Sequence, residues 1–450
     1  MSAATQTTPD SDVRTHALAA RAAARQLAAT SGEVRDAGLE AIAVALESER
    51  EAILAANAED LVAAQQMAAR GELGEPLVAR LNLATGKYDR AIEMVRSVKS
   101  ADDPLWQTQR ATEIDGGLNL FRVTMPIGVL GVIFESRPDA LIQIAAVCLK
   151  SGNAVLMKGG SEASRSNRAL GDLIVRATAS VEGLPAGWLT LMESRKDVKQ
   201  MLAQDDAIDL IIPRGSNEFV RYIMDNTSIP VTGHADGICH VYVDKAADLD
   251  KALRVAVDSK VQDVSTCCTV ETLLVHRDVA EAFLQRTVRQ LEEEKVEVRG
   301  DERTRAIAGN GRVVVATEED WSTEYLDYIL SVKVVDSLAE AMTHINRYGS
   351  AHTDTIVTED RQRAVRFLQG VEACSALVNA STRFADGYRY GLGAEVGIST
   401  GRLHSRGPVG MEGLTTYKYL LEGDGHTVDD YEGAAPKPYT HRRLEATWRA

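Results

Sequence analysis

Residues 126–163 have the sequence PIGVLGVIFESRPDALIQIAAVCLKSGNAVLMKGGSEA, which carries the strongest structural signal in the chain. Two short apolar runs, at 127–135 and 153–160, flank a segment at 139–152 whose apolar residues have helical spacing. A strand, a helix and a second strand in this order are typical of a parallel sheet with a crossover helix. The alternation continues in further apolar runs at 188–193 and 207–215. We therefore predict an α/β unit of the nucleotide-binding type.

A second series of apolar runs indicates a second domain of similar architecture. These runs are ICHVYVD at 238–244, TVETLLVH at 269–276, SVKVVD at 331–336, DTIVTED at 354–360 and CSALVNAS at 374–381. The predicted fold class is α/β, with two α/β domains that each contain a parallel sheet. We assign 1–110 and 126–235 to the first domain and 236–414 to the second.

The chain outside these units is predicted to contain helices and a hairpin. The first hundred residues are rich in Ala, with Leu and Ile at helical spacing and breaks at Ser31-Gly32 and near Gly71. Two β-prone arms at 111–125 surround Gly116-Gly117, which indicates a hairpin. Two strands alone are marginally stable in water, so we expect this hairpin and an arm at about 415–450 to contact another copy of the chain, in a dimer or larger homo-oligomer.

Composition excludes several classes of protein. The 65 acidic and 50 basic residues give a net charge of −15, which argues against nucleic acid or an anionic membrane as a partner. The chain has no apolar run of 18 residues and no secretory signal pattern. Five cysteines at irregular spacing, without a CxxC or HExxH motif, favour a reducing, cytoplasmic location and argue against a metal site.

Two adjacent cysteines, Cys267 and Cys268, precede the predicted strand TVETLLVH. A loop next to a rigid strand is a common place for a reactive group. A buried, inert thiol is nevertheless the commoner fate of a single cysteine. The residues alone leave both interpretations open.

Five segments of the chain together resemble one protein family. They are the stretch at 126–163, DLIIPRGSN at 209–217, CCTVETLLVH at 267–276, VDSLAEAMTHINRYGSAHTDTIVTED at 335–360 and NASTRFADGYRYGLGAEVGISTGRLHSRGPVGMEGLTTYKY at 379–419. From about residue 15 to 425 the sequence resembles the gamma-glutamyl phosphate reductases of the aldehyde dehydrogenase superfamily. The resemblance implies an aldehyde dehydrogenase-like fold, an oligomerisation hairpin, and an oxidoreductase that reduces L-glutamyl 5-phosphate to L-glutamate 5-semialdehyde in proline biosynthesis.

The resemblance implies covalent catalysis by Cys267. Its thiolate would attack the acyl phosphate and release phosphate, leaving a thioester that is then reduced to the aldehyde. Cys268 occupies a position that is often asparagine in this family, so it remains the alternative nucleophile. Arg137 stands where oxidising aldehyde dehydrogenases have an asparagine that donates to the oxyanion, and we expect it to contact a phosphoryl or carboxylate oxygen of the substrate. A surface salt bridge is the other interpretation of Arg137.

A missing glutamate distinguishes two candidate activities. Oxidising aldehyde dehydrogenases use a glutamate to activate water, whereas the comparable segment here, VTGHADGICHVYVD at 231–244, has none. His234 or Asp236 could take that place, although a solvated turn is the simpler interpretation. We expect the phosphate-releasing reductase, and keep the oxidising enzyme and a catalytically silent relative as alternatives.

The resemblance favours NADPH as the cofactor, without excluding NAD, and a small molecule as the substrate. The positions predicted to hold the cofactor are Lys158, Ser161 and Glu162 for the adenosine ribose, Arg214, Gly215 and Ser216 for the nicotinamide end, and Glu324 for the nicotinamide ribose. The positions predicted to hold the substrate are Asn379, Ser381, Thr382, Arg383 and His352.

Two of these substrate positions have a specific predicted role. Arg383 is expected to bind the α-carboxylate of the substrate. His352 is either a general acid paired with Asp354 or part of a structural cluster. We see no kinase module ahead of residue 15, so we expect glutamate 5-kinase, which would supply the acyl phosphate, to be a separate partner protein.

Overall fold

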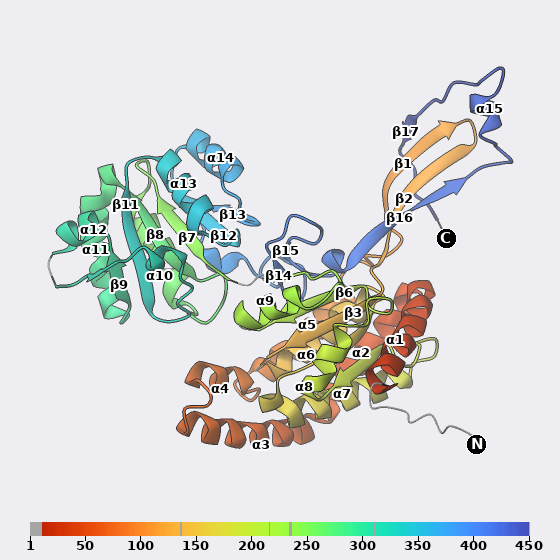
Figure 1. Cartoon of the computed structure of the whole chain (residues 1–450), viewed down its shortest axis with the longest axis horizontal. Helices are drawn as coiled ribbons and strands as arrows, with labels where there is room; N and C mark the ends of the chain where they lie inside the picture. Colours follow the sequence, from red (N-terminus) through yellow and green to blue (C-terminus); the bar gives the residue numbers. More distant parts are fainter. Residues whose placement is uncertain (1–10, 136, 216, 234–235, 310, 450) are drawn as a thin grey trace, which may run out of the picture.

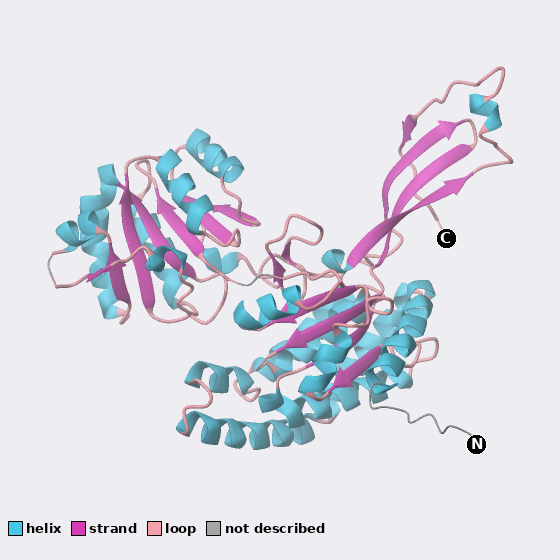
Figure 2. Ribbon diagram, viewed as in Figure 1, coloured by secondary structure: helices cyan, strands magenta, loops and turns pink. Residues whose placement is uncertain are grey.

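The computed structural model describes residues 11–135, 137–215, 217–233, 236–309 and 311–449 of the 450-residue chain. Two groups of strands covered by helices form the body of the molecule, and a third, antiparallel sheet projects away from it (Figure 1). Figure 2 shows these three sheets as separate groups of arrows. The predicted fold class is thereby confirmed.

The first parallel sheet contains the stretch at 126–163. Its strand order is β5-β4-β3-β6, and the strands are β3 (Val129–Phe134), β4 (Ala154–Lys158), β5 (Leu189–Met192) and β6 (Leu210–Arg214). The associated helices are α6 (Pro138–Lys150), α7 (Ser164–Ala179), α8 (Arg195–Met201) and α9 (Asn217–Asp225), with η1 (Ser161–Ala163) before α7. Every residue of β3 and β4 is buried, because helices cover both faces of a parallel sheet.

Five helices at the N-terminal side extend the core of this unit. They are α1 (Ser11–Ala29), α2 (Gly32–Ser48), α3 (Arg50–Ala69), α4 (Glu75–Leu81) and α5 (Lys87–Ser100). The predicted breaks are present: Ser31 caps α2 through its side chain, and α3 ends before Gly71. Two buried polar side chains of α3 hold the following turns, since Asn57 donates to the carbonyl of Leu81 and Asp60 accepts from the backbone of Ser166.

The second sheet has seven parallel strands in the order β10-β9-β11-β8-β7-β12-β13. They are β7 (Cys239–Val243), β8 (Val270–His276), β9 (Glu297–Gly300), β10 (Val314–Val315), β11 (Ile329–Val335), β12 (Thr353–Val357) and β13 (Ser375–Val378). Its helices are α10 (Leu249–Val261), α11 (Arg277–Glu293), α12 (Glu302–Ala308), α13 (Leu338–Tyr348) and α14 (Arg361–Gly370), with η2 (Glu319–Ser322) and η3 (Thr382–Phe384). A short pair, β14 (Ile398–Ser399) and β15 (Gly407–Pro408), follows, and η4 (Glu412–Leu414) leads to the last strands.

The predicted hairpin belongs to a four-stranded antiparallel sheet. Strands β1 (Thr108–Asp115) and β2 (Leu118–Pro126) meet at Gly116-Gly117, where Gly117 has a φ of 82°. The C-terminal part adds β16 (Thr415–Glu422) beside β2 and β17 (Arg442–Leu444) beside β1, with α15 (Asp429–Glu432) between them. The hairpin is therefore not isolated, because strands about 300 residues away in the same chain extend the sheet. A contact of this sheet with another copy of the chain stays a prediction.

None of the helices in the described ranges combines the length and the apolar character that a bilayer crossing requires. The two α/β units contact each other at the turn that carries Cys267, where Arg80 reaches Ser265. The carboxyl ends of β3, β4 and β6 lead to Arg137, Gly159 and Gly215, and the loop before β8 lies near Arg214.

Candidate active site

Cys267 lies in a tight turn between α10 and β8. Asp263 fixes this turn, because its side chain accepts from the backbone and hydroxyl of Ser265 at 3.0 and 2.7 Å. Its carbonyl oxygen accepts from the hydroxyl of Thr269 at 2.6 Å. Although burial disfavours the charged form of Asp263, the Ser265 hydrogen bonds hold the pKa of its carboxyl below the usual value. The turn therefore presents Cys267 at the start of a rigid strand.

The two adjacent cysteines have opposite environments. Cys267 is partly exposed, whereas Cys268 is 3% exposed and its sulfur accepts a hydrogen bond from Arg383. Burial raises the pKa of the Cys268 thiol to about 12, and the neighbouring Cys267 contributes to this shift. A thiol that is buried and protonated at neutral pH is a poor nucleophile. The geometry therefore favours Cys267, whose catalytic role stays a prediction.

Basic side chains from the first α/β unit gather around Cys267. Arg214 lies at the carboxyl end of β6, and Arg137 precedes α6. Arg80 of α4 donates a hydrogen bond to the carbonyl oxygen of Ser265. Loss of hydration lowers the pKa of both Arg80 and Arg214, the nearby charge of Arg137 lowers each further, and the charge of Cys267 opposes both shifts. The site therefore concentrates positive charge next to the thiol.

Gly237 separates the backbone of Cys267 from Glu324. A Cβ at position 237 would lie 2.6 Å from the Cα of Cys267 and 2.6 Å from Oε1 of Glu324, so only glycine fits there. This glycine belongs to the segment in which oxidising relatives were expected to have their glutamate. Asp236 pairs with Arg221 at 3.0 Å, and His234 lies outside the described residues.

The residues predicted to bind the adenosine ribose lie at the carboxyl ends of β4 and β5. A small hollow there is lined by Gly159, Gly160, Ser161, Ser164, Asn167, Leu191, Met192 and Glu193. Lys158 is buried, and its ammonium group donates to the carbonyl of Gly159 at 2.6 Å. Asn167 is 3% exposed, and its Oδ1 has no hydrogen-bond partner among the described residues. A buried acceptor without a donor fits a ligand hydroxyl or amino group.

The glycines and the nicotinamide-end residues fit the same interpretation. A Cβ at Gly159 would lie 2.9 Å from the Cγ of Asn167. Glycine is therefore required here, and it lets the side chain of Asn167 pack against the backbone where the strand ends. Gly215 is exposed after β6, while Ser216 lies outside the described residues. These observations are compatible with a dinucleotide, whose phosphates and ribose favour strand ends and helix starts.

The predicted substrate residues occupy the turn after β13 but are engaged with the protein. Arg383 is 6% exposed and donates to Gln262 at 2.9 Å as well as to Cys268. These two bonds hold Arg383 against the turn that carries the cysteines. Asn379 holds the backbone of Thr358 through both ends of its amide, at 2.9 and 3.0 Å. The further members, Ser381 and Thr382, are buried beside Ser259. A direct contact of these residues with substrate stays a prediction.

His352 does not pair with Asp354. The carboxylate of Asp354 contacts Nδ1 of His240 at 2.9 Å, and both side chains are buried. Nδ1 of His352 lies 2.8 Å from the hydroxyl of Thr353 and 3.7 Å from the sulfur of Cys239. Parallel pairing of β12 with β7 brings His240 beside Asp354, which favours the structural cluster of the two interpretations. A catalytic role of His352 stays a prediction.

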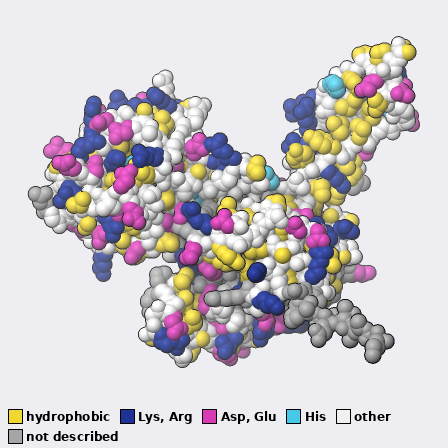
Figure 3. Space-filling view, viewed as in Figure 1, with side chains coloured by type: hydrophobic (Ala, Val, Ile, Leu, Met, Phe, Trp, Pro, Cys, Tyr) yellow, Lys and Arg dark blue, Asp and Glu magenta, His cyan; other side chains and the backbone are white. Residues whose placement is uncertain are grey.

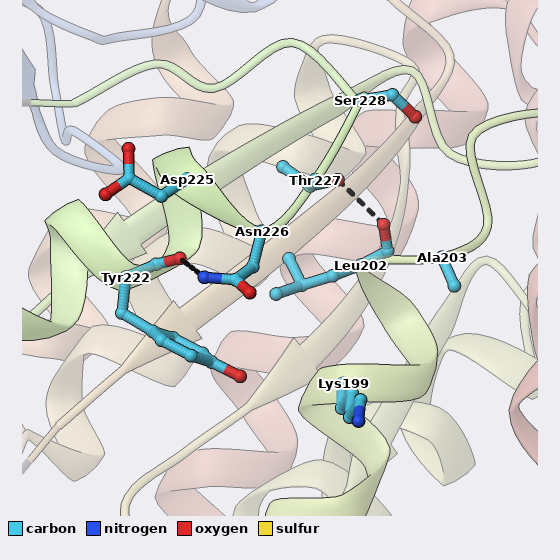
Figure 4. A pocket seen from close by; sticks show the side chains of 8 residues that line it. All are labelled: Lys199, Leu202, Ala203, Tyr222, Asp225, Asn226, Thr227 and Ser228. Carbon is cyan, nitrogen blue, oxygen red and sulfur yellow. Dashed lines mark hydrogen bonds between the residues drawn. The ribbon is translucent and has the colours of Figure 1, made fainter.

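A larger surface hollow, of about 440 Å³, lies between α8 and α9 (Figure 4). Its lining residues are Lys199, Leu202, Ala203, Tyr222, Asp225, Asn226, Thr227 and Ser228. Asn226 donates to the carbonyl of Tyr222 at 2.8 Å, and Thr227 donates to that of Leu202 at 2.7 Å. None of them belongs to the Cys267 turn, so the chemistry is not assigned to this hollow.

Sequence reasoning missed several residues of the site. Arg80 and Lys87 lie in a helical region that was interpreted as packing alone, and no local pattern distinguishes Arg80 from a solvated arginine. Glu395 was also missed, and its pKa is raised to about 7, because burial disfavours the carboxylate more than nearby Arg214 favours it. The glycine pattern before β7 was the one signal that could have directed attention to Gly237.

Comparisons with known proteins agree with this geometry. The model of the aldehyde dehydrogenase family matches residues 2–308. A gamma-glutamyl phosphate reductase of Natronomonas pharaonis is 55% identical over 430 residues, which cover 96% of this chain and 97% of the relative. One of Haloquadratum walsbyi is 54% identical, with 95% and 94% covered. The crystal structure of the Thermotoga maritima gamma-glutamyl phosphate reductase superposes with a TM-score of 0.87 at 39% identity, covering 92% of this chain and 99% of that chain.

Proposed function

The chain belongs to the gamma-glutamyl phosphate reductases of the aldehyde dehydrogenase family, and from this premise we propose how its residues perform the reaction. The protein is an oxidoreductase that converts L-glutamyl 5-phosphate to L-glutamate 5-semialdehyde, a step of proline biosynthesis. The observation that supports this most directly is 55% identity over nearly the whole length of a reductase. Cys267 is partly exposed where the two α/β units meet, and it supplies the nucleophile that this activity needs.

Cys267 acts as the nucleophile. Its thiolate attacks the acyl carbon, the bond from that carbon to the phosphate oxygen breaks, and phosphate leaves with the electron pair. The product is a thioester on Cys267. Positive charge from Arg137 and Arg214 favours both the thiolate and the departing anion. Cys268 stays protonated beneath the turn and does not compete.

The cofactor of the reaction is NADPH. When bound, it supplies the hydride that reduces the thioester to the aldehyde. Lys158, Ser161 and Glu162 would hold the adenosine ribose, with Asn167 as a further contact, and Glu324 would hold the nicotinamide ribose next to Gly237. A buried ammonium group beside the adenosine end favours a 2′-phosphate over a free hydroxyl, which is the reason for preferring NADPH to NADH.

The alternative is an aldehyde dehydrogenase that hydrolyses its thioester. Hydrolysis needs a base close to Cys267, and the segment before β7 presents Gly237 there, in contact with the cysteine backbone. Asp236 is engaged with Arg221. The position where oxidising relatives have their glutamate therefore offers no base, as a phosphate-releasing reductase requires.

One coupled assay separates these activities. Supplied with glutamate semialdehyde and NADP⁺, the purified enzyme should form NADPH only when inorganic phosphate is present, because phosphate must attack the thioester. NADPH formation at the same rate without phosphate would instead identify the hydrolysing enzyme. The same assay with NAD⁺ measures the cofactor preference.

The partners follow from the same premise. The acyl phosphate is reactive toward water, so a kinase that phosphorylates glutamate must supply it, and glutamate 5-kinase is the expected separate partner.

We also propose that the antiparallel sheet mediates homo-oligomer formation and that the enzyme works in the cytoplasm. In the same proposal, residues 1–110 and 126–235 form the cofactor-binding domain, and residues 236–414 form the catalytic domain.

A further inference from the structure

Two arginines near Cys267 carry buried donors that lack a partner. Arg80 donates to the carbonyl of Ser265, but its Nε is buried without an acceptor among the described residues. Nη1 of Arg214 is also buried and has no acceptor among the described residues. A buried polar group without a hydrogen bond is costly, and the cost is larger when the group is charged. Arg80 is anchored to the Cys267 turn through Ser265, and the charges of Cys267 and Arg137 act on both arginines, so an anion beside Cys267 could satisfy both donors.

A further basic side chain lies close to these arginines. Lys87 adds a fourth basic side chain, since the charges of Arg137 and Arg80 lower its pKa after the larger effect of burial. Two of the nearby acids already have donors, because Asp263 accepts from Ser265 and Glu395 accepts from the backbone of Gly387 at 2.9 Å. The charges of Glu324 and Asp139 also act on this group of basic side chains.

We propose that Arg80 and Arg214, together with Arg137, bind the phosphoryl group of the substrate and the inorganic phosphate that it becomes. This inference rests on the proposed function. The phosphoryl group is joined through one oxygen to the carbon that Cys267 attacks, so its site must lie beside that sulfur. The α-carboxylate lies at the far end of the glutamyl chain and carries one charge. A tetrahedral anion with several terminal oxygens suits several guanidinium groups at once.

The contact of Arg80 links the phosphate site to the meeting of the two α/β units. Arg80 belongs to α4, whose end is held by Asn57, while its guanidinium reaches the turn that carries Cys267. The ammonium group of Lys87 donates to the carbonyls of Ala79 and Arg80 at 3.0 Å each and fixes the helix end. The arginine is thereby positioned before substrate arrives, which lowers the cost of binding.

The test measures the reverse reaction of Arg80→Met and Arg80→Lys, with phosphate, semialdehyde and NADP⁺ varied in turn. For Arg80→Met we expect the KM for phosphate to rise about tenfold or more, because a charge-assisted hydrogen bond is lost. The KM values for semialdehyde and NADP⁺ should stay within about twofold, and Arg80→Lys should lie between the wild type and Arg80→Met. Arg96→Met is the matched control, since Arg96 forms an exposed pair with Glu47.

An unchanged KM for phosphate, or a parallel rise of all three KM values, would overturn the phosphate site while the wild-type activity still supports the proposed function. A rise confined to semialdehyde or NADP⁺ would overturn it as well, by assigning Arg80 to a carboxylate or to the cofactor. A wild-type enzyme without phosphate-dependent activity would contradict the proposed function and the site together.

A measurement on the wild type covers the case in which the variants fail to fold. Inorganic phosphate at millimolar concentration should slow the alkylation of Cys267 by iodoacetamide, followed by mass spectrometry of the labelled peptide. Chloride at equal ionic strength should not slow it. Equal labelling in phosphate and chloride would overturn the proposal.

Discussion

Cys267 and Cys268 illustrate how neighbours in sequence acquire different chemistry. A peptide that turns into a buried strand directs successive side chains to opposite sides. Cys268 therefore packs inward against Arg383, and Cys267 remains reachable. The reactivity of a thiol follows its exposure and the stability of its thiolate, so the difference is functional.

Substitution of each cysteine by serine measures this difference. Cys267→Ser should lower kcat by about a thousandfold or more, because no thioester can form at a hydroxyl with its much higher pKa. Cys268→Ser should retain activity within about fivefold, because that thiol is protonated and buried. The rates are measured with saturating acyl phosphate or in the reverse assay. An equal loss in both variants would contradict the assignment.

His344 is a buried residue that should make stability depend on pH. Neither ring nitrogen has a hydrogen-bond partner among the described residues, and Trp321 packs edge-on at 5.4 Å. Burial, followed by the charges of His240, Lys333 and Arg347, lowers the pKa of His344 to about 2. The folded state holds this group neutral, so its stabilising contribution is complete above the unfolded pKa of about 6.5 and falls as pH drops below it.

The expected slope is about 1.4 kcal/mol per pH unit below pH 6.5 for this one residue. Urea unfolding of the wild type and of His344→Phe at pH 7.5 and 5.5 measures it. The variant should lose less stability on acidification than the wild type does. The same loss in both proteins would show that His344 does not titrate on unfolding.

At the scale of elements, α10, β8 and the loop before β11 are joined by a buried ion pair. The ammonium group of Lys260 lies 2.7 Å from Oε2 of Glu271, and both side chains are fully buried. Oε1 of Glu271 accepts from the backbone of Leu326, close to Glu324. Burial raises the pKa of Glu271 and lowers that of Lys260, while each partner opposes the shift of the other. The pair thus holds the Glu324 loop against the strand that follows Cys267.

Removing one partner should cost more than removing both. Glu271→Leu leaves a buried ammonium group unpaired, and we expect about 3–5 kcal/mol less stability. The double variant Lys260→Met with Glu271→Leu should recover most of this loss, since apolar residues of similar volume tolerate burial. Chemical unfolding of the two single variants and the double variant measures the coupling. Additive losses would show that the two side chains do not act as a pair.

At the scale of the molecule, the antiparallel sheet is the exposed arm on which hydrophobic side chains gather (Figure 3). Strand β16 presents Tyr417, Tyr419 and Leu421 on one side, and they are 47%, 60% and 59% exposed. Large apolar side chains on a projecting sheet are typical of an interaction surface. β16 and β17 are the two edge strands of this sheet, and β16 is the longer of them.

Lysine at these positions should weaken the predicted homo-oligomer. We expect the double variant Tyr419→Lys with Leu421→Lys to sediment with a smaller mass than the wild type at micromolar concentration, because charge is buried at the interface. Val62→Lys, an equivalent change at an exposed position of α3, is the control and should leave the mass unchanged. Wild-type and variant proteins that both sediment as monomers would contradict the prediction of an oligomer.

Much of the fold could be predicted because its signals are local. The apolar runs at 127–135, 153–160 and 269–276 became β3, β4 and β8, since a strand buried on both faces must be apolar throughout. The breaks at Ser31 and near Gly71 follow from capping and glycine propensity. The pairing of the hairpin with β16 and β17 was not predicted, because β-pairing over about 300 residues leaves no local trace.

From the amino-acid sequence we could predict the order of strands and helices, the α/β class and the candidate nucleophile. These depend on residue type and spacing along the chain. Tertiary structure alone decided which polar residues meet: Arg80 with the Cys267 turn, Asp354 with His240, and Arg383 with Cys268. The physical reason is that such contacts depend on burial and on distance in space, which packing of remote elements sets.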